Sequence, residues 1–338
     1  AMLYEENLLK DGERFYDSGS TTVNGIELNC WSDTAHGQQS IKKALANSCN
    51  PVFAKLGLRI GMERFFDYVS MFGYDNITGI DFPGEAQAIL QDQNKATSVD
   101  LATMAYGQGI AVTPIQLISA VSAIGNDGVM MQPHLVKEIK SSDGSKSTKV
   151  KPKIVRQILS KKTSNQLKSA MKYVVNHSSA SNSKVPGYTI GGKTGTANKP
   201  NATGYSDQTN SSFIGMAPME DPKVTVLVIV DNPKGIKYGS IVAGPCAHDI
   251  FENILPYLGI EPSSKIKSEE KAENNTVKVP DVRGLTYSKA KSKLKKAGLK
   301  VKVQKGNSKK KSFKVDDQYP NAGSSVEKKT TIYLYGSN

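Results

Sequence analysis

The chain has 338 residues, of which 38% are hydrophobic, so it is long enough to bury the cores of one large and one small domain. No run of 18 apolar residues occurs, which excludes a transmembrane helix within these residues. Cys30, Cys49 and Cys246 form no C-x-x-C pair and are odd in number, so neither a zinc site nor a full disulfide framework is indicated. We therefore predict no metal and no cofactor.

The net charge of +13 is concentrated in the C-terminal part of the chain. Residues 276–338 carry 16 Lys and Arg against 4 Asp and Glu, whereas the first 275 residues carry 28 against 27. A basic module attracts anionic polymers, and both nucleic acids and the polymers of a cell envelope have that charge. Charge alone therefore leaves the partner of this module open.

The first 260 residues predict a mixed domain of helices and strands. An Asn24-Gly25 turn between alternating residues predicts a hairpin, and residues 1–9 have the spacing of the end of a helix that begins upstream. The predicted helices cover residues 38–47, 51–58, 62–72, 99–106, 114–126, 164–175 and 239–258. Three-residue spacing puts Ile115, Ile118, Val121 and Ile124 on the buried side of the fifth of these helices. The predicted strands cover residues 188–196, 212–219 and 224–230.

Two polar residues lie at the junction of the first two of these helices. Pro51 disfavours helical geometry at Asn50 and suits the first turn of a new helix. Ser48 and Asn50 are therefore expected on a tight turn, where side chains two apart can converge on a cavity. In the alternative interpretation Asn50 is only the N-cap of the second helix, and Ser48 is a hydroxyl that ends the first.

Two glycines followed by Lys193, Thr194, Gly195 and Thr196 end the predicted strand over residues 188–196. The glycines would let a ligand approach the backbone closely. A cation, two hydroxyls and exposed edge N–H groups suit a substrate that carries a carboxylate and an extended peptide backbone. The same residues also fit the phosphate-loop pattern G-x-x-x-x-G-K-[ST]. No apolar strand precedes that pattern and no helix can follow it, so the context excludes a nucleotide site.

A charged polar linker over residues 261–275 separates the first domain from a second one over residues 276–338. In the second domain, residues 287–296 predict a short helix, and residues 299–303 and 330–335 predict strands. This domain is expected to be a small β-α-β-β unit.

Together these motifs resemble those of two known families. Ser48-Cys-Asn50 and Lys193-Thr-Gly195 are similar to the second and third motifs, S-x-N and K-[ST]-G, of the penicillin-recognising serine transpeptidases. The order of motifs over residues 1–260 resembles class B penicillin-binding proteins. The tail resembles a PASTA domain, through Val279-Pro-Asp-Val-Arg-Gly284 and Gln318-Tyr-Pro-Asn-Ala-Gly323. One PASTA domain after the transpeptidase is similar to the sporulation-type and cell-division-type enzymes.

The resemblance implies an α/β (α+β) fold of the penicillin-binding and serine β-lactamase type. Its five-stranded antiparallel sheet would be flanked by helices, with Lys193 on an edge strand. The implied enzyme is a peptidoglycan D,D-transpeptidase that binds β-lactams. It acylates a serine with the D-alanyl-D-alanine end of one stem peptide and passes the acyl group to an amine of another. Such an enzyme works at the extracytoplasmic face of the bacterial membrane, with cell-wall polymer and not nucleic acid as the partner of its basic tail.

The same resemblance implies a role for each residue of the two motifs. Ser48 would relay protons, Asn50 would hold the substrate amide, and Lys193 would supply positive potential. Thr194 and Thr196 would bind the substrate carboxylate, and the N–H of Thr196 would be one oxyanion donor.

The chain departs from the family pattern in the first motif, S-x-x-K, which carries the nucleophile and the base. That motif would lie roughly two to three helical turns before Ala1, with a membrane anchor further upstream, so we expect the chain to be a fragment. Three formal matches occur elsewhere, and we interpret them as solvated surface: Ser40-Ile-Lys-Lys43, Ser181-Asn-Ser-Lys184 and Ser288-Lys-Ala-Lys291.

Two other functions share these motifs. A non-catalytic penicillin-binding-like sensor or cell-wall-binding scaffold would keep the fold and the tail without the chemistry. A β-lactamase would need a deacylating base, and the PASTA-like tail and long insertions disfavour it.

Overall fold

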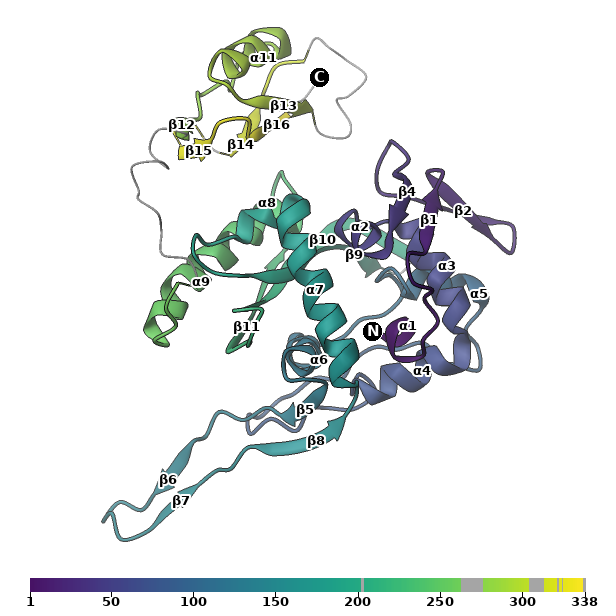
Figure 1. The fold of residues 1–338 in the computed structure, drawn as a ribbon, viewed down its shortest axis with the longest axis vertical. Coiled ribbons are helices and arrows are strands. Elements are labelled where there is room, and N and C mark those ends of the chain that lie inside the picture. The colour runs from purple at the N-terminus through teal and green to yellow at the C-terminus, as the bar shows by residue number, and fades with distance from the viewer. Residues whose placement is uncertain (202–203, 263–275, 304–312, 321, 324, 337–338) are drawn as a thin grey trace. The chain divides into compact units, whose positions relative to one another are not determined.

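The computed structural model describes residues 1–201, 204–262, 276–303, 313–320, 322–323 and 325–336. The chain divides into two compact units, Ala1–Ser263 and Ser264–Asn338 (Figure 1). The linker expected over residues 261–275 lies almost wholly outside the described residues. Within the described parts of the chain, no helix is both long and apolar enough to cross a bilayer.

The first unit contains a long-stranded sheet, several helices and four pairs of short strands. The helices are α1 (Met2–Glu5), α2 (Ile41–Ala46), α3 (Asn50–Ile60), α4 (Met62–Met71), α5 (Ser98–Met104), α6 (Pro114–Gly125), α7 (Lys161–His177), the 3-10 helix η1 (Ser179–Ser183), α8 (Gly239–Val242) and α9 (Gly244–Tyr257). The strands of the long sheet are β9 (Gly191–Asn201), β10 (Gly204–Ala217) and β11 (Val224–Asp231). The short strands are β1 (Arg14–Asp17), β2 (Ser20–Val23), β3 (Ile26–Asn29), β4 (Gly37–Ser40), β5 (Val129–Gln132), β6 (Glu138–Lys140), β7 (Ser147–Lys149) and β8 (Lys153–Gln157).

The long sheet is antiparallel and has the order β11-β10-β9, which leaves β9 at an edge. The position expected for Lys193, on an edge strand, is confirmed. The resemblance implied five strands, but this sheet has three in the described residues. The other strands of the unit have only three to five residues and pair among themselves as β1-β4, β2-β3, β5-β8 and β6-β7.

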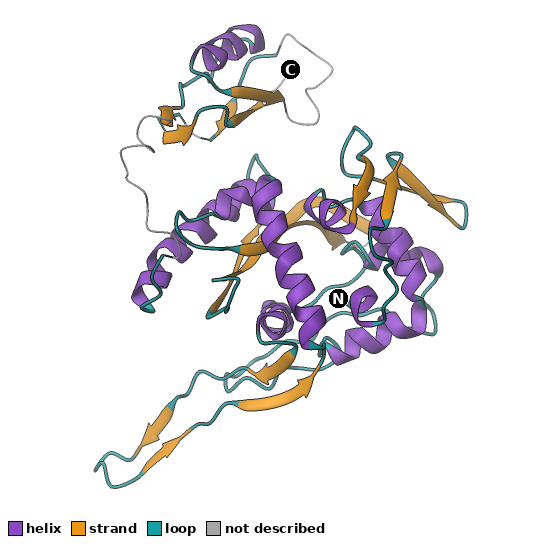
Figure 2. Ribbon diagram, in the orientation of Figure 1, coloured by secondary structure: helices purple, strands orange, loops and turns teal. Residues whose placement is uncertain are grey.

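Helices cover both faces of this sheet (Figure 2). On one face, Phe213 of β10 packs in a cluster with Phe251 of α9, and both are fully buried. On the other face, Met216 of β10 packs with Met171 of α7 and Ile124 of α6. Side chains of a strand alternate between faces, so β10 is the central strand that joins the two layers of helix.

Two predicted helices differ from the observed ones for local reasons. Residues 37–40 pair with β1 as a strand, so α2 begins only at Ile41, with the Ser40 hydroxyl as its N-cap. The helix predicted over residues 239–258 is two helices, α8 and α9, that meet at Ala243. Pro245 stands at the start of α9, where its missing N–H would interrupt a continuous helix.

In its described residues, the second unit has one helix and five strands: β12 (Thr276–Lys278), α11 (Tyr287–Lys296), β13 (Lys300–Val303), β14 (Asp317–Tyr319), β15 (Ser325–Glu327) and β16 (Thr331–Tyr335). The predicted helix is confirmed. The described residues contain two strands more than the expected β-α-β-β unit, β14 and β15, which are too short to show alternation in the sequence. The buried side chain of Gln318 accepts from the N–H of Val282 (2.6 Å) and donates to the carbonyl of Pro280 (3.0 Å). These bonds join the two sequence segments that suggested this domain.

Candidate active site

A cleft of about 530 Å³ lies where the turn between α2 and α3 meets the edge strand β9. The cleft lining includes every residue that the two sequence motifs singled out: Ser48, Asn50, Lys193, Thr194, Gly195 and Thr196. Two segments about 145 residues apart in the chain therefore meet at one cavity, where Ser48 and Lys193 are hydrogen-bonded to each other.

The turn that carries Ser48 has a special backbone conformation. Ser48 has φ 49°, in the left-handed region, which costs a non-glycine residue on the order of 1 kcal/mol or more. The N–H of Cys49 donates to the carbonyl of Ala44 (3.0 Å), and both Cys49 and Ala44 are fully buried. This anchoring holds the turn in a conformation that presents Ser48 and Asn50 to the cleft.

The two motifs touch through Lys193. Its Nζ donates to the hydroxyl oxygen of Ser48 and to the carbonyl of Thr194 (2.7 Å). Burial lowers the pKa of Lys193 to about 8, because a charged amine loses solvation at this site. Among the described residues, no carboxylate forms an ion pair with it. Lys193 is thus a cation without a charged partner, placed beside a hydroxyl.

Two glycines of the strand that carries Lys193 let neighbouring side chains pack closely against its backbone. A Cβ at Gly192 would lie 2.5 Å from Cζ of Phe213, and one at Gly191 would lie 2.5 Å from Sδ of Met219. The sequence suggested that these glycines let a ligand approach, but the structure shows that they admit core side chains. Gly195 differs from these two glycines in its neighbour, because a Cβ there would meet a polar atom, Oγ of Ser212, at 2.6 Å.

The start of α8 packs against β9 at Gly239. The N–H of Gly239 donates to Oγ1 of Thr196 (3.1 Å), which leaves the Thr196 O–H able to donate to a ligand. A Cβ at Gly239 would lie 2.3 Å from the carbonyl oxygen of Ser212 and 2.4 Å from that of Gly195. Only glycine lets the start of α8 approach these strands so closely.

We therefore expect Gly239→Ala to lower the free energy of unfolding of this chain by roughly 1 to 3 kcal/mol, as overpacking against rigid backbone does. Gly244→Ala is the matched control, since its Cβ would meet nothing closer than Cβ of Asn182 at 3.3 Å. Urea unfolding of the two variants checks this. Equal midpoints would show that the start of α8 moves aside at no cost.

The cleft also contains residues that the sequence motifs did not indicate. Trp31 is 45% exposed, its Nε1–H donates to the carbonyl of Asn47 (2.8 Å), and its ring lies 6.4 Å from that of Tyr238. Lys237 also lines the cleft. All three residues lie outside regular helices and strands, where periodicity gives no signal. That Trp31 is the only tryptophan of the chain is the one feature that could have drawn attention to it.

No serine that lines the cleft has a lysine three residues later. Ser48 is followed at that distance by Pro51, Ser179 by Asn182 and Ser240 by Ala243. The described residues of the cleft therefore contain no S-x-x-K pair.

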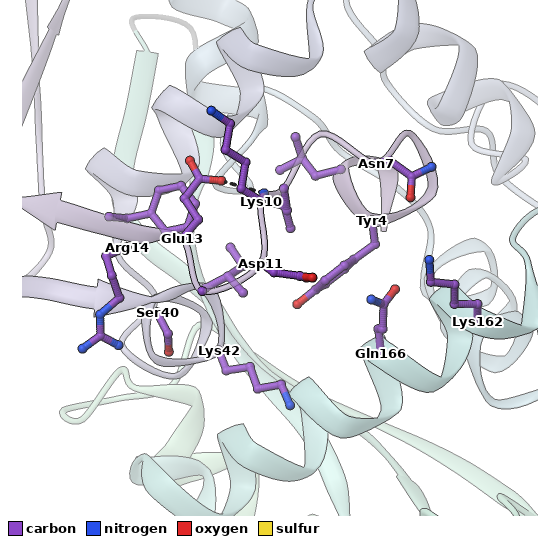
Figure 3. A pocket seen from close by; sticks show the side chains of 15 residues that line it. Tyr4, Asn7, Lys10, Asp11, Glu13, Arg14, Ser40, Lys42, Lys162 and Gln166 are labelled. Atoms are coloured by element: carbon purple, nitrogen blue, oxygen red, sulfur yellow. Dashed lines mark hydrogen bonds between the residues drawn. The ribbon is translucent and has the colours of Figure 1, made fainter.

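The formal S-x-x-K matches lie elsewhere. Ser40 caps α2, accepts from the N–H of Lys43 (3.3 Å), and lines a separate pocket of about 310 Å³ beside Lys42 and Gln166 (Figure 3). Its partner Lys43 is exposed. In the other two matches both the serine and the lysine are exposed, at Ser181 and Lys184 and at Ser288 and Lys291. Their interpretation as surface residues is confirmed for these two pairs and for Lys43.

Comparison with known proteins supports both sequence resemblances. The family described as "Penicillin binding protein transpeptidase domain" matches residues 1–252, and the family described as "PASTA domain" matches residues 277–338. The chain belongs to the penicillin-binding protein transpeptidases and carries a PASTA domain.

Two curated relatives show how similar the chain is to individual proteins. The chain is 38% identical to the stage V sporulation protein D of Bacillus subtilis over 99% of its own length and 52% of the relative. It is 30% identical to a probable peptidoglycan D,D-transpeptidase, PbpC, of Pseudomonas aeruginosa, over 65% of this chain and 38% of that protein. The chain thus spans about half the length, or less, of these curated relatives.

Solved structures agree on the fold. The ampicillin complex of penicillin-binding protein 3 from Mycobacterium tuberculosis has a TM-score of 0.71 and 26% identity, over 79% of this chain and 62% of that one. The transpeptidase domain of penicillin-binding protein 3 from Burkholderia pseudomallei has a TM-score of 0.68 and 27% identity, over 78% and 77%. The predicted penicillin-binding fold is confirmed.

Proposed function

We propose that this chain forms most of the active site of a peptidoglycan D,D-transpeptidase that works through a serine acyl-enzyme and binds β-lactams. The observation that carries the proposal is the contact between Lys193 Nζ and the Ser48 hydroxyl, in a cleft bordered by an edge strand. The substrate lies outside the cytoplasm, so we place the enzyme at the extracytoplasmic face of the bacterial membrane.

In this proposal the substrate lies along β9 as an extended peptide. Ser48 passes a proton toward the leaving group, and the charge of Lys193 keeps its hydroxyl polarised. Asn50 holds an amide of the stem peptide. The hydroxyls of Thr194 and Thr196 donate to the substrate carboxylate, and the N–H of Thr196 donates to the oxyanion.

We further propose that the nucleophilic serine and its lysine base lie upstream of Ala1. Two observations support this. None of Ser48, Ser179 and Ser240 in the cleft belongs to an S-x-x-K pair, and the Ser48 hydroxyl already accepts a hydrogen bond from Lys193. A form extended upstream to include an S-x-x-K motif, called the extended form below, would complete the site.

We expect the present chain to give no covalent adduct with a fluorescent penicillin, and the extended form to give one. Denaturing electrophoresis with in-gel fluorescence measures this, and peptide mapping locates the adduct. A stable adduct on Ser40, Ser48 or any other serine of this chain would overturn the assignment. An extended form with an intact motif that does not label would favour the sensor or scaffold alternative.

We also propose that the PASTA domain binds anionic cell-wall polymer. The lysines of α11 are all exposed: Lys289, Lys291, Lys293, Lys295 and Lys296. No carboxylate among the described residues forms an ion pair with these five lysines, so their charge is available to a ligand.

Deleting residues 276–338 should reduce the retention of the protein on purified cell walls and leave acylation of the extended form unchanged. The retention should also fall with added salt, because exposed charges are screened within about 10 Å at 0.1 M ionic strength. Sedimentation with cell walls at two salt concentrations tests this. Equal retention with and without the domain would mean that the lysines serve only solubility.

A further inference from the structure

A two-stranded arm of the first unit has an open strand edge and a basic charge. The arm consists of residues 129–157, which form the pairs β5-β8 and β6-β7 and project away from the helices of that unit (Figure 1). None of its residues lines the cleft of the proposed active site. The arm is therefore a surface that the transpeptidase reaction does not explain.

The outer edge of β8 is unpaired. In the described residues β8 has β5 as its one neighbour, and no hydrogen bond from outside this pair of strands reaches the backbone of residues 153–156. The other side of the pair differs, because Asp81 accepts from the N–H groups of Leu135 (2.6 Å) and Val136 (2.9 Å) just after β5. Free N–H and C=O groups along a strand are a template for a further strand.

An apolar groove of about 670 Å³ lies beside β8, between α6 and the β5-β8 pair. Ile154 of β8 lines this groove and is 65% exposed. The larger apolar side chains of the lining are Ile115, Ile118, Val129, Met131, Pro133 and Ile154. A strand added to β8 would point every second side chain toward this face, so apolar residues at alternate positions would fit the groove.

The charge of the arm selects what can bind beside β8. Residues 129–157 contain seven Lys and Arg against two Asp and Glu, whereas the rest of the first 275 residues contains 21 against 25. Lys149, Lys151 and Lys153 are exposed, and no carboxylate among the described residues forms an ion pair with them. A segment with acidic side chains would therefore be attracted to β8, and a basic segment would be repelled.

Two other kinds of partner match these features less completely. A membrane would offer no hydrogen-bond partners to the backbone groups of the open edge, and residues 141–146 at the end of the arm are polar. An anionic polymer would pair with the lysines but would leave the apolar groove unfilled. An extended peptide segment satisfies the edge, the groove and the charge together.

We propose that β8 is the docking site of another protein, which adds an extended segment with alternating apolar and acidic residues as a third strand. Lys153 and Ile154 are neighbours on β8 and point to opposite faces. The apolar side chains of the partner would fill the groove on the Ile154 face, and its acidic side chains would meet the lysines on the other. In this mode of recognition, main-chain hydrogen bonds give affinity and side-chain pockets give specificity. Docking at β8 does not involve the cleft, so a negative result would leave the transpeptidase proposal untouched.

A designed peptide tests the docking site on the whole chain. The peptide is short, fluorescent and built of Val alternating with Glu. Fluorescence anisotropy measures its binding, and hydrogen exchange with mass spectrometry locates it. We expect it to slow the exchange of amides in residues 153–156 and to bind about tenfold more weakly to the double variant Lys151→Glu, Lys153→Glu. The same peptide with Lys in place of Glu should bind that variant better than the wild type.

Matched variants separate the site from general charge and exposure. The double variant Lys43→Glu, Lys184→Glu makes the same charge change with exposed lysines outside the arm, so it should bind the peptide as the wild type does. Ile154→Ser should weaken binding about tenfold, because the groove loses an apolar contact. Ile139→Ser should not, since Ile139 is 61% exposed but does not line the groove.

Four other outcomes would contradict the proposal. If the Val-Glu peptide does not bind or does not protect β8, the lysines only keep the edge from pairing, as they do on many edge strands. Equal binding of a Ser-Glu peptide would indicate an anionic polymer recognised by charge alone. Retention on phosphatidylglycerol vesicles that is lost in Lys151→Glu, Lys153→Glu would indicate a membrane surface. A concentration-dependent dimer that the same variant loses would indicate a second copy of this chain.

Discussion

Replacing Lys193 with Met is expected to slow β-lactam acylation of the extended form by about 100- to 1,000-fold, or roughly 2.7 to 4 kcal/mol of barrier. The reason is geometric. Lys193 Nζ is bonded to Ser48, and no carboxylate among the described residues neutralises it, so its field acts on the cleft. Melting temperature should change little, since the variant removes a desolvated charge and leaves the aliphatic stem.

The control for this variant is Lys199→Met on the same strand. Lys199 pairs with Asp231 and does not line the cleft, so its loss should leave the acylation rate within about twofold. The second-order rate constant for labelling by a fluorescent penicillin measures both variants. Similar rates for the two would remove Lys193 from the mechanism.

The lowered pKa of Lys193 adds a pH dependence to this expectation. Lys193 is cationic below its pKa of about 8 and neutral above it, so the contribution of its charge is present at pH 7 and lost as the pH rises through 8. An ordinary lysine would keep its charge to about pH 10. The acylation rate of the extended form should therefore fall between about pH 7 and 9. In Lys193→Met that particular fall should be absent.

The sequence predicted most of the elements that position this cleft, because their signals are local. Pro51 marked the break between α2 and α3, Asn24-Gly25 marked the turn of the β2-β3 hairpin, and both glycine and asparagine there have positive φ. The pair of motifs then placed Ser48, Asn50 and Lys193 in one site, although they lie far apart in the chain.

Features that depend on tertiary packing were not predictable in the same way. Spacing located α6 correctly but only part of its buried side: Val121 and Ile124 pack against a buried cluster, as predicted. Gln116 is fully buried and its side chain donates to the carbonyl of Asn76 (2.8 Å), while Ile115 and Ile118 border an open groove. A polar side chain can be buried when its hydrogen bonds are satisfied, and hydrophobic periodicity does not report that. The contact of Trp31 with Tyr238 has the same origin, since both residues lie on loops.

Asn50→Ala is the second substitution with a large expected effect, because it separates a substrate-binding role from a structural one. The sequence left open that Asn50 is the N-cap of the second helix. In the structure α3 begins at Asn50 itself, and the N-cap is Cys49. The side chain of Asn50 lines the cleft and donates to the carbonyl of Asn29 (3.2 Å). The capping interpretation is therefore wrong, and the variant should not lose a cap.

We expect Asn50→Ala to slow acylation of the extended form by about 100-fold or more, with a free energy of unfolding within about 0.5 kcal/mol of wild type. Thr97→Ala shows what the loss of a real cap does, since Thr97 accepts from the N–H of Asp100 (3.2 Å) and forms a capping box with it. That control should lose about 1 kcal/mol of stability and keep its acylation rate. Urea unfolding and penicillin labelling of both variants decide the matter. If Asn50→Ala instead behaves like Thr97→Ala, destabilised but acylated at the wild-type rate, Asn50 supports the turn and does not hold the substrate.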